Sequence, residues 1–181
     1  MCNSFNKKFL EEAAKHWSGS EDQRDGRVDG FMKEAIQLAL RGLYDNDGVH
    51  FGCLIFKDDK IIGRGNKRFT SKHDQTENDE ILAIREACAH LGSHQLEGCV
   101  IYTSCEPCPM CLGAIYWARP DKVFYAGTRE DAAKSGFDDA FIYEQIGLPP
   151  EQRSIEFLQM DRKEAQLAFT RWDEKEDKTE Y

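Results

Sequence analysis

The sequence predicts an α/β fold in which helices cover both faces of a single sheet. The first observation is the spacing of apolar residues, which changes repeatedly between helical and strand periodicity along the chain. The second is the composition, with 40% hydrophobic and 31% charged residues, which is typical of a folded globular protein. The third is the length of 181 residues, which suits one domain with a substantial core.

Residues 1–26 are predicted to be an extension and linker that precede the domain. Apolar residues at helical spacing predict a short amphipathic helix over 5–17, and the polar stretch after it is typical of a linker. The domain itself is predicted over residues 27–181. It opens with a helix over 28–43, because apolar side chains recur there at helical spacing.

The middle of the chain predicts a hairpin followed by alternating helices and strands. The apolar runs 51–56 and 61–66 are separated by a polar turn, which is typical of two paired strands. A helix over 79–91, a third strand over 99–103 and a helix over 108–118 follow. The last helix ends before a proline, which disfavours helical backbone at the residue before it.

The C-terminal third predicts two more strands and one more helix. A fourth strand is expected over 123–126 and a fifth over 155–159, because both are short apolar runs. A helix is expected over 161–175, and a charged tail follows it.

Net charge and cysteine content restrict the partners and the location. The formal net charge is −9, and binding to a phosphate backbone relies on clustered Lys and Arg, so a small neutral or cationic molecule is favoured over a nucleic acid. No apolar run approaches the roughly 20 residues that cross a membrane, and the start of the chain lacks the apolar core of a signal peptide. The seven cysteines, without a secretion signal, predict reduced thiols and a cytoplasmic location.

Two segments carry the residues expected to do chemistry. Cys108 and Cys111 form a Pro-Cys-x-x-Cys motif at a predicted helix start, so both sulfurs face one side of the first turn and suit a single tetrahedral zinc. This motif is the second half of a zinc deaminase signature whose first half is His-x-Glu. Here the first half reads Asn-Asp-Glu. Glu80, which would move protons beside the metal, is present, but Asn78 replaces the imidazole ligand.

A Cys-x-x-Cys pair by itself is also compatible with a redox-active or purely structural role. The preceding proline and the position between a strand and a helix favour zinc. Cys105, just upstream, is expected to be an ordinary strand-end thiol. Cys53, Cys88 and Cys99 occupy apolar positions and are expected in the core.

The chain resembles the bacterial guanine deaminases of the cytidine-deaminase-like superfamily. Four segments carry the similarity: 76–87, 102–120, 136–143 and the closing Glu180-Tyr181. The resemblance implies a three-layer α/β/α sandwich around a five-stranded mixed sheet, one bound Zn²⁺ per chain, and hydrolytic deamination of guanine or a related amino-heterocycle. It also implies a homodimer in which the segment from about residue 155 to 181 is exchanged with the partner subunit.

The resemblance assigns roles to individual residues. It makes Cys108 and Cys111 the zinc thiolates and Glu80 the proton shuttle. Asp139 matches the carboxylate that reads the edge of the base. Three further residues are implied to close or frame the pocket: Glu164, Trp172 and Tyr181.

Three positions at the implied site depart from the family pattern. Asn78 stands in place of the zinc-binding histidine, Lys67 stands where a base-binding asparagine is expected, and His50 stands in place of a proline. Asn66 adjoins Lys67, so a shift of one residue would restore the asparagine. Two interpretations of Asn78 stay open. Either His50, or less favourably His73, replaces the missing ligand, or Asn78 caps its helix and His50 is merely hydrogen-bonded.

Three classes of function are compatible with this sequence. The first is a zinc aminohydrolase acting on guanine or a related amino-heterocycle, which the retained glutamate and thiols favour. The second is a non-catalytic binding module that keeps the fold and the dimer, which Asn78 and Lys67 favour. The third is an enzyme of different chemistry on a purine-like ligand, with Lys67 and His50 as new polar groups.

Overall fold

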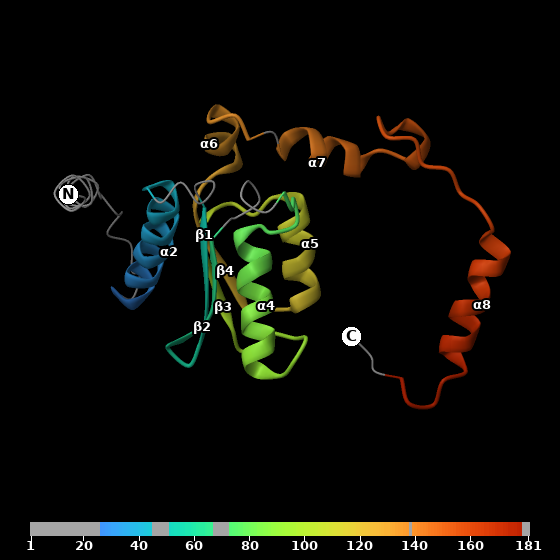
Figure 1. Cartoon of the computed structure of the whole chain (residues 1–181), viewed down its shortest axis with the longest axis horizontal. Coiled ribbons are helices and arrows are strands. Elements are labelled where there is room, and N and C mark those ends of the chain that lie inside the picture. Colours follow the sequence, from blue (N-terminus) through green and yellow to red (C-terminus); the bar gives the residue numbers. More distant parts are fainter. Residues whose placement is uncertain (1–25, 45–50, 67–72, 138, 179–181) are drawn as a thin grey trace. The chain divides into compact units, whose positions relative to one another are not determined.

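The computed structural model describes residues 26–44, 51–66, 73–137 and 139–178 (Figure 1). The chain divides into two compact units, residues 1–30 and 31–181, and the sheet belongs to the second unit. The helix predicted over 5–17 lies outside the described residues.

The sheet has four strands in the order β2-β1-β3-β4. Strand β1 (Gly52–Lys57) pairs antiparallel with both β2 (Lys60–Asn66) and β3 (Val100–Cys105), while β4 (Lys122–Gly127) runs parallel to β3. The sheet is therefore mixed, and β1 and β2 form the predicted hairpin.

The fifth strand predicted over 155–159 is wrong. This segment contains no strand, and its apolar side chains are exposed, by 71% for Ile155 and 73% for Leu158. The apolar run indicated a need for burial, but in the described part of this chain no strand pairs with it. Helix α8 (Arg162–Asp173) follows this segment, where a helix over 161–175 is expected.

Helices lie on both faces of the sheet (Figure 1). On one face α4 (Asp79–Leu91) approaches β2 so closely that a Cβ on Gly63 would clash with a carbonyl oxygen of the helix. Helix α5 (Pro109–Ala118) packs beside α4. On the other face α2 (Gly26–Tyr44) makes the same kind of close approach to β1 at Gly52.

In the described part of the chain, no helix combines the length and apolar character that a membrane span requires.

The main core lies between the sheet and helices α4 and α5. Side chains alternate between the two faces of a strand, so Cys53 and Ile55 of β1 point to this side. The small side chains Ala83 and Ala87 let α4 lie close to the strands. The buried cluster comprises Cys53, Ile55, Ile62, Ala83, Ala87, Leu96, Cys99, Ile101, Ile115 and Ala118.

Two short helices after β4 occur where the sequence predicts none. Helix α6 (Arg129–Lys134) begins with a capping box, in which the side chains of Thr128 and Asp131 each accept a hydrogen bond from the other's backbone N–H. The Thr-x-x-Asp spacing is a signal for this helix that the sequence does contain. Helix α7 (Asp139–Gly147) has no buried residue, so hydrophobic periodicity gives no signal for it.

Candidate active site

The candidate site lies where two helices begin. Helix α4 starts directly after Asn78, and α5 starts at Pro109, directly after Cys108. Proline suits the first position of a helix, because its missing N–H would have no intrahelical partner there. The two helix starts meet at the side chains of Asn78 and Cys108. Because backbone N–H groups and the positive ends of both helix dipoles collect there, the region favours negatively charged sulfur and oxygen atoms.

Gly65 in strand β2 determines how closely α4 can approach. A Cβ on Gly65 would overlap the carbonyl group of Asp79 at the first position of the helix. Only glycine therefore lets α4 begin at this distance from the strand. Because Asn78 and Glu80 both belong to this helix start, the position of two candidate site residues depends on a glycine in the neighbouring strand.

Asn78 and the two thiols form a compact triangle of polar atoms. The Asn78 amide Nδ2 donates hydrogen bonds to Cys108 Sγ at 3.3 Å and to Cys111 Sγ at 3.4 Å, and the two sulfurs are 3.3 Å apart. Asn78 occupies the N-cap position of α4, yet its side chain makes no capping hydrogen bond. The interpretation of this side chain as a helix cap is therefore wrong, because the amide is turned toward the sulfurs instead.

The two thiols differ in acidity. The hydrogen bond between the sulfurs lowers the pKa of Cys108 to about 7, although burial acts in the opposite direction. The same hydrogen bond, together with burial, raises the pKa of Cys111. The negative charge of Glu80 also acts to raise the pKa of each thiol. Cys108 is therefore the first of the pair to reach the thiolate form that binds metals.

Glu80 lines the same cavity as Asn78 and Cys108 and is held there by a hydrogen bond. Its side chain is 4% exposed, and its Oε1 accepts a hydrogen bond of 2.8 Å from Thr103 Oγ1. Thr103 lies in β3, is fully buried, and pairs across the sheet with Cys53. Because the hydroxyl is fixed by a central strand, it fixes the carboxylate that it contacts.

One cavity brings several of the predicted residues together. It measures about 40 Å³, which is room for water but not for a purine. Its walls contain Asn78, Glu80 and Cys108 from the helix starts and the half-buried Asp139 from the first position of α7. The full lining is Phe51, Asn78, Asp79, Glu80, Cys105, Glu106, Cys108, Phe137 and Asp139.

Other predicted residues are not brought to this cavity by the described chain. His73 is exposed and does not line it. Glu164 and Trp172 belong to α8, whose residues are all exposed, and neither lines the cavity. Asn66 ends β2, and only its backbone is described. Three predicted residues lie outside the described part of the chain: His50, Lys67 and Tyr181.

Two polar residues of the site are not predicted from the sequence. Thr103 could be found from strand alternation, because it shares the α4 side of β3 with the buried Ile101. Tyr143 of α7 has no such signal, because its contact with the Pro107 carbonyl depends on how the helix is placed. Cys105, by contrast, is the strand-end thiol expected, and its Sγ lies 3.7 Å from the Thr128 carbonyl oxygen.

The two thiols lie close enough to bind one zinc ion, whereas the Asn78 amide turns toward them its Nδ2, a hydrogen-bond donor that is not a metal ligand. With metal bonds of about 2.0–2.3 Å, two ligands of a tetrahedral zinc lie about 3.3–3.8 Å apart. The two sulfurs are 3.3 Å apart, at the lower end of this range, and Asn78 would bind zinc only through its carbonyl Oδ1. Two thiolates balance the charge of the ion, whereas an amide is a weaker third donor than imidazole. Within the described residues, no group of three or more His, Cys, Asp or Glu side chains is placed to hold a metal.

The fold and the paired helix starts are those of a zinc-dependent deaminase. The family model of the cytidine and deoxycytidylate deaminase zinc-binding region matches residues 26–127, and the chain belongs to this family.

Guanine deaminases are among its relatives. Guanine deaminase of Bacillus subtilis (strain 168) is 50% identical over 151 residues, which cover 83% of this chain and 97% of that protein. The X-ray structure of guanine deaminase from Bacillus subtilis matches with a TM-score of 0.82 at 49% identity, over 84% of this chain and 98% of that chain. A tRNA-specific adenosine deaminase from Aquifex aeolicus (strain VF5) is 36% identical over 53% of this chain and 63% of that protein. The resemblance to guanine deaminases is thus confirmed.

Proposed function

We propose that the protein removes the exocyclic amino group of guanine by hydrolysis, with one zinc ion held by Cys108 and Cys111. The observation that carries the proposal is the convergence of a thiol of this pair, the buried Glu80 and Asp139 in one cavity. The Bacillus subtilis relative, which is named a guanine deaminase, matches the chain over 97% of its own length. The net charge of −9 supports a small base over a nucleic acid as the substrate.

In the proposed reaction, water adds to the ring carbon that bears the amino group, and ammonia leaves. When bound, zinc supplies the Lewis acidity that makes water a nucleophile at neutral pH. Glu80 accepts one proton from the attacking water and delivers it to the ring nitrogen, and it then accepts the proton of the added hydroxyl and delivers it to the departing amine, so that a carbonyl and ammonia are formed. The hydrogen bond from Thr103 would hold the carboxylate in one orientation through both transfers.

Asp139 is proposed to orient the base. A carboxylate accepts hydrogen bonds from the ring N–H and amino groups that guanine presents along one edge. Asp139 lines the cavity that also contains Glu80, so a base bound to Asp139 would place its reactive carbon near the proton shuttle. An analogue without those donors would leave the half-buried carboxylate without these hydrogen bonds, which disfavours its binding.

Ammonia release from a panel of bases tests the proposal. We expect turnover of guanine, weaker turnover of other aminopurines and aminotriazines, and none of guanosine, which carries a ribose. The Asp139→Ala protein should lose most of its discrimination between guanine and the other aminopurines, because the polar partner of the base edge is removed. If the zinc-loaded protein releases no ammonia from any of these compounds, it is a binding module or has a different chemistry.

Thr103 gives a second prediction for the same reaction. Replacing Thr103 with Val keeps the shape but removes the hydroxyl, and kcat should fall by about 10- to 100-fold, since a hydrogen bond to a charged group contributes about 1.5–3 kcal/mol. Thr103→Ser retains the hydroxyl and should recover most of the activity. The two variants are compared by steady-state kinetics, and a Val variant with unchanged kcat would show that the contact is only structural.

The two other classes of function have less support. A non-catalytic module would not need a buried carboxylate held by a buried threonine beside two thiols. A different reaction on a purine-like ligand rests on Lys67 and His50, which lie outside the described residues. The hydrolase is therefore the better-supported proposal.

We also propose a homodimer in which the segment 155–181 packs against the partner subunit. Within the described residues this segment exposes a series of large apolar side chains, and extended apolar surface of this kind is uncommon in monomers. Exchange of an identical element between subunits would bury it. In such a dimer Glu164 and Trp172 would act at the partner's site. The exposed side chains are Ile155, Phe157, Leu158, Met160, Leu167, Phe169 and Trp172.

A charge placed on this surface should separate the subunits. The double variant Leu167→Asp and Phe169→Asp is expected to shift the protein from dimer to monomer in sedimentation velocity at micromolar concentration, because a carboxylate in an apolar interface is strongly disfavoured. Lys163→Glu, on the same helix, is the control and should leave the dimer intact. A wild-type protein that sediments as a monomer would contradict the proposal.

A further inference from the structure

Helix α7 brings Asp139 to the cavity although none of the helix is buried. Asp139 occupies its first position, and the helix ends at Gly147. A helix without buried side chains receives little stabilisation from packing. Its position must therefore depend on a small number of specific contacts.

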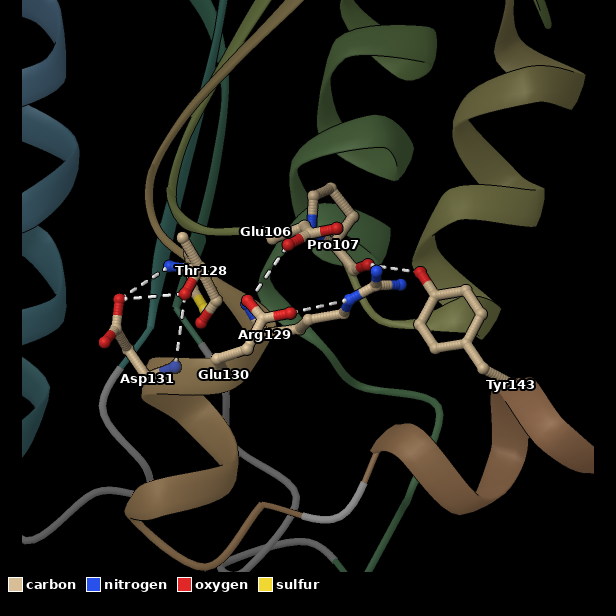
Figure 2. Close-up of polar contacts among 8 residues, drawn as sticks. Glu106, Pro107, Thr128, Arg129, Glu130, Asp131 and Tyr143 are labelled. Atoms are coloured by element: carbon tan, nitrogen blue, oxygen red, sulfur yellow. Dashed lines mark hydrogen bonds and ion pairs between the residues drawn. The ribbon is translucent and has the colours of Figure 1, made fainter.

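Tyr143 supplies the clearest of these contacts, as Figure 2 shows. Its hydroxyl donates a hydrogen bond of 3.2 Å to the backbone carbonyl of Pro107. Pro107 is buried and directly precedes Cys108, so the hydrogen bond joins α7 to the loop that carries the thiol pair. The pKa of Tyr143 is raised, mainly by burial, so it moves further above neutral pH and the hydroxyl stays a hydrogen-bond donor, as that of any tyrosine does there.

The Tyr143 ring also contacts Arg129, the first residue of α6. The Arg129 guanidinium lies 5.4 Å from the centre of the ring, a cation–π distance, and its Nε contacts Glu130 Oε1 at 3.3 Å. The Arg129 backbone N–H donates to Glu106 Oε2 at 3.1 Å, which ties the start of α6 to the same loop (Figure 2). Tyr143 therefore lies between two segments that are themselves connected.

The spacing along α7 links this anchor to substrate recognition. Tyr143 follows Asp139 by four residues, so the two side chains lie on the same face of the helix, one turn apart. A contact that fixes Tyr143 against the residue before Cys108 also fixes the distance between Asp139 and the reacting centre. Loss of the hydroxyl would leave that distance variable without removing any group that touches the base.

We propose that Tyr143 is a positioning residue for base recognition, which acts through Asp139. The inference rests on the proposed guanine deaminase function and adds a determinant of base affinity that lies outside the cavity. Tyr143→Phe should raise KM for guanine about three- to tenfold, the range that corresponds to one neutral hydrogen bond, and change kcat by less than about twofold. Tyr125→Phe, half-exposed on β4, is the matched control and should change neither.

A double-mutant cycle tests whether the effect passes through Asp139. Equilibrium dialysis of radiolabelled guanine is measured in the Glu80→Gln background, so that binding is observed without turnover. Tyr143→Phe should raise Kd about three- to tenfold when Asp139 is present and less than about twofold when Asp139→Asn is also present. Equal effects in the two backgrounds, or no effect in either, would overturn the inference while guanine binding itself upholds the proposed function. A folded Glu80→Gln protein that binds no guanine would overturn both.

Hydrogen exchange supplies a measurement that does not depend on binding. In Tyr143→Phe the amides of residues 139–147 should exchange faster than in the wild type, while those of α4 and α5 stay unchanged. Unchanged exchange in α7 would show that the hydroxyl does not hold the helix, and the inference would fail.

Discussion

Replacing Glu80 with Gln is expected to lower kcat for guanine by about 100- to 10,000-fold, the range for loss of a general acid–base group. The amide has nearly the same shape as the carboxylate and can still accept the hydrogen bond from Thr103. It cannot take up the proton of the attacking water, so proton transfer is lost while the fold is kept. Ammonia release at saturating guanine measures the effect.

The zinc content and the thermal stability of Glu80→Gln are measured as controls for the loss of activity. Glu80 is hydrogen-bonded to Thr103 and is not among the proposed zinc ligands, so zinc per chain and the thermal unfolding midpoint of Glu80→Gln should match the wild type. Glu86→Gln makes the same chemical change on an exposed position of the same helix and should leave kcat unchanged. More than about a tenth of the wild-type kcat in Glu80→Gln would exclude Glu80 as the main proton shuttle.

Replacing Asn78 with His is expected to raise zinc affinity at least about tenfold, because even groups outside the coordination shell change metal affinity by 10- to 100-fold. The amide already reaches within 3.3–3.4 Å of both sulfurs, so an imidazole from the same position reaches the same region. Imidazole is the stronger donor to zinc. Competition against a chromophoric chelator measures the affinity, and guanine deamination should rise with zinc occupancy.

Two further variants separate the possible third ligands. If Asn78 completes the coordination of zinc, Asn78→Ala should lower zinc affinity and His50→Ala should leave it unchanged. If His50 already fills that position, Asn78→His should have no effect or reduce activity, and His50→Ala should remove the metal. Wild-type protein that binds zinc fully, with unchanged binding in both Ala variants, would leave His73 or water as the remaining donor.

The thiol pair gives a pH dependence with a definite sign. Zinc binds the thiolate form, and the pKa of Cys108 is lowered to about 7 while that of Cys111 is raised. Zinc affinity should therefore increase as pH rises through 7, because fewer protons have to be displaced. The zinc affinity is measured by the same chelator competition between pH 6 and pH 8. An affinity that falls as the pH rises would contradict the prediction.

Much of the scaffold could be predicted because its signals are local. The apolar spacing over 79–91 gives α4 with its observed bounds, and the left-handed Gly92 that ends the helix is also visible in the sequence. The hairpin over 51–66 is formed by two apolar runs and a polar turn. The motif at Cys108 and Cys111 was predictable for the same reason, since a helix start and an i, i+3 spacing place both sulfurs together.

The wrong strand at 155–159 shows the limit of such signals. Apolar residues indicate that a segment must be buried, but they do not indicate by which surface or which chain. The same limit applies to α7, whose residues are all at least partly exposed and whose Tyr143 contacts Pro107, 36 positions earlier in the chain.

By itself, the sequence determined the α/β class, the starts of α4 and α5 and the residue types at the site, because periodicity and short motifs act within a few residues. Only the tertiary structure decided that Thr103 is hydrogen-bonded to Glu80. This contact depends on the register of β3 against β1 and on the close approach of α4 to Gly65 of β2. The tertiary structure likewise decided that the Asn78 amide faces two sulfurs rather than its own helix. These contacts join residues 23 to 33 positions apart, and their partners are selected by packing rather than by neighbouring sequence.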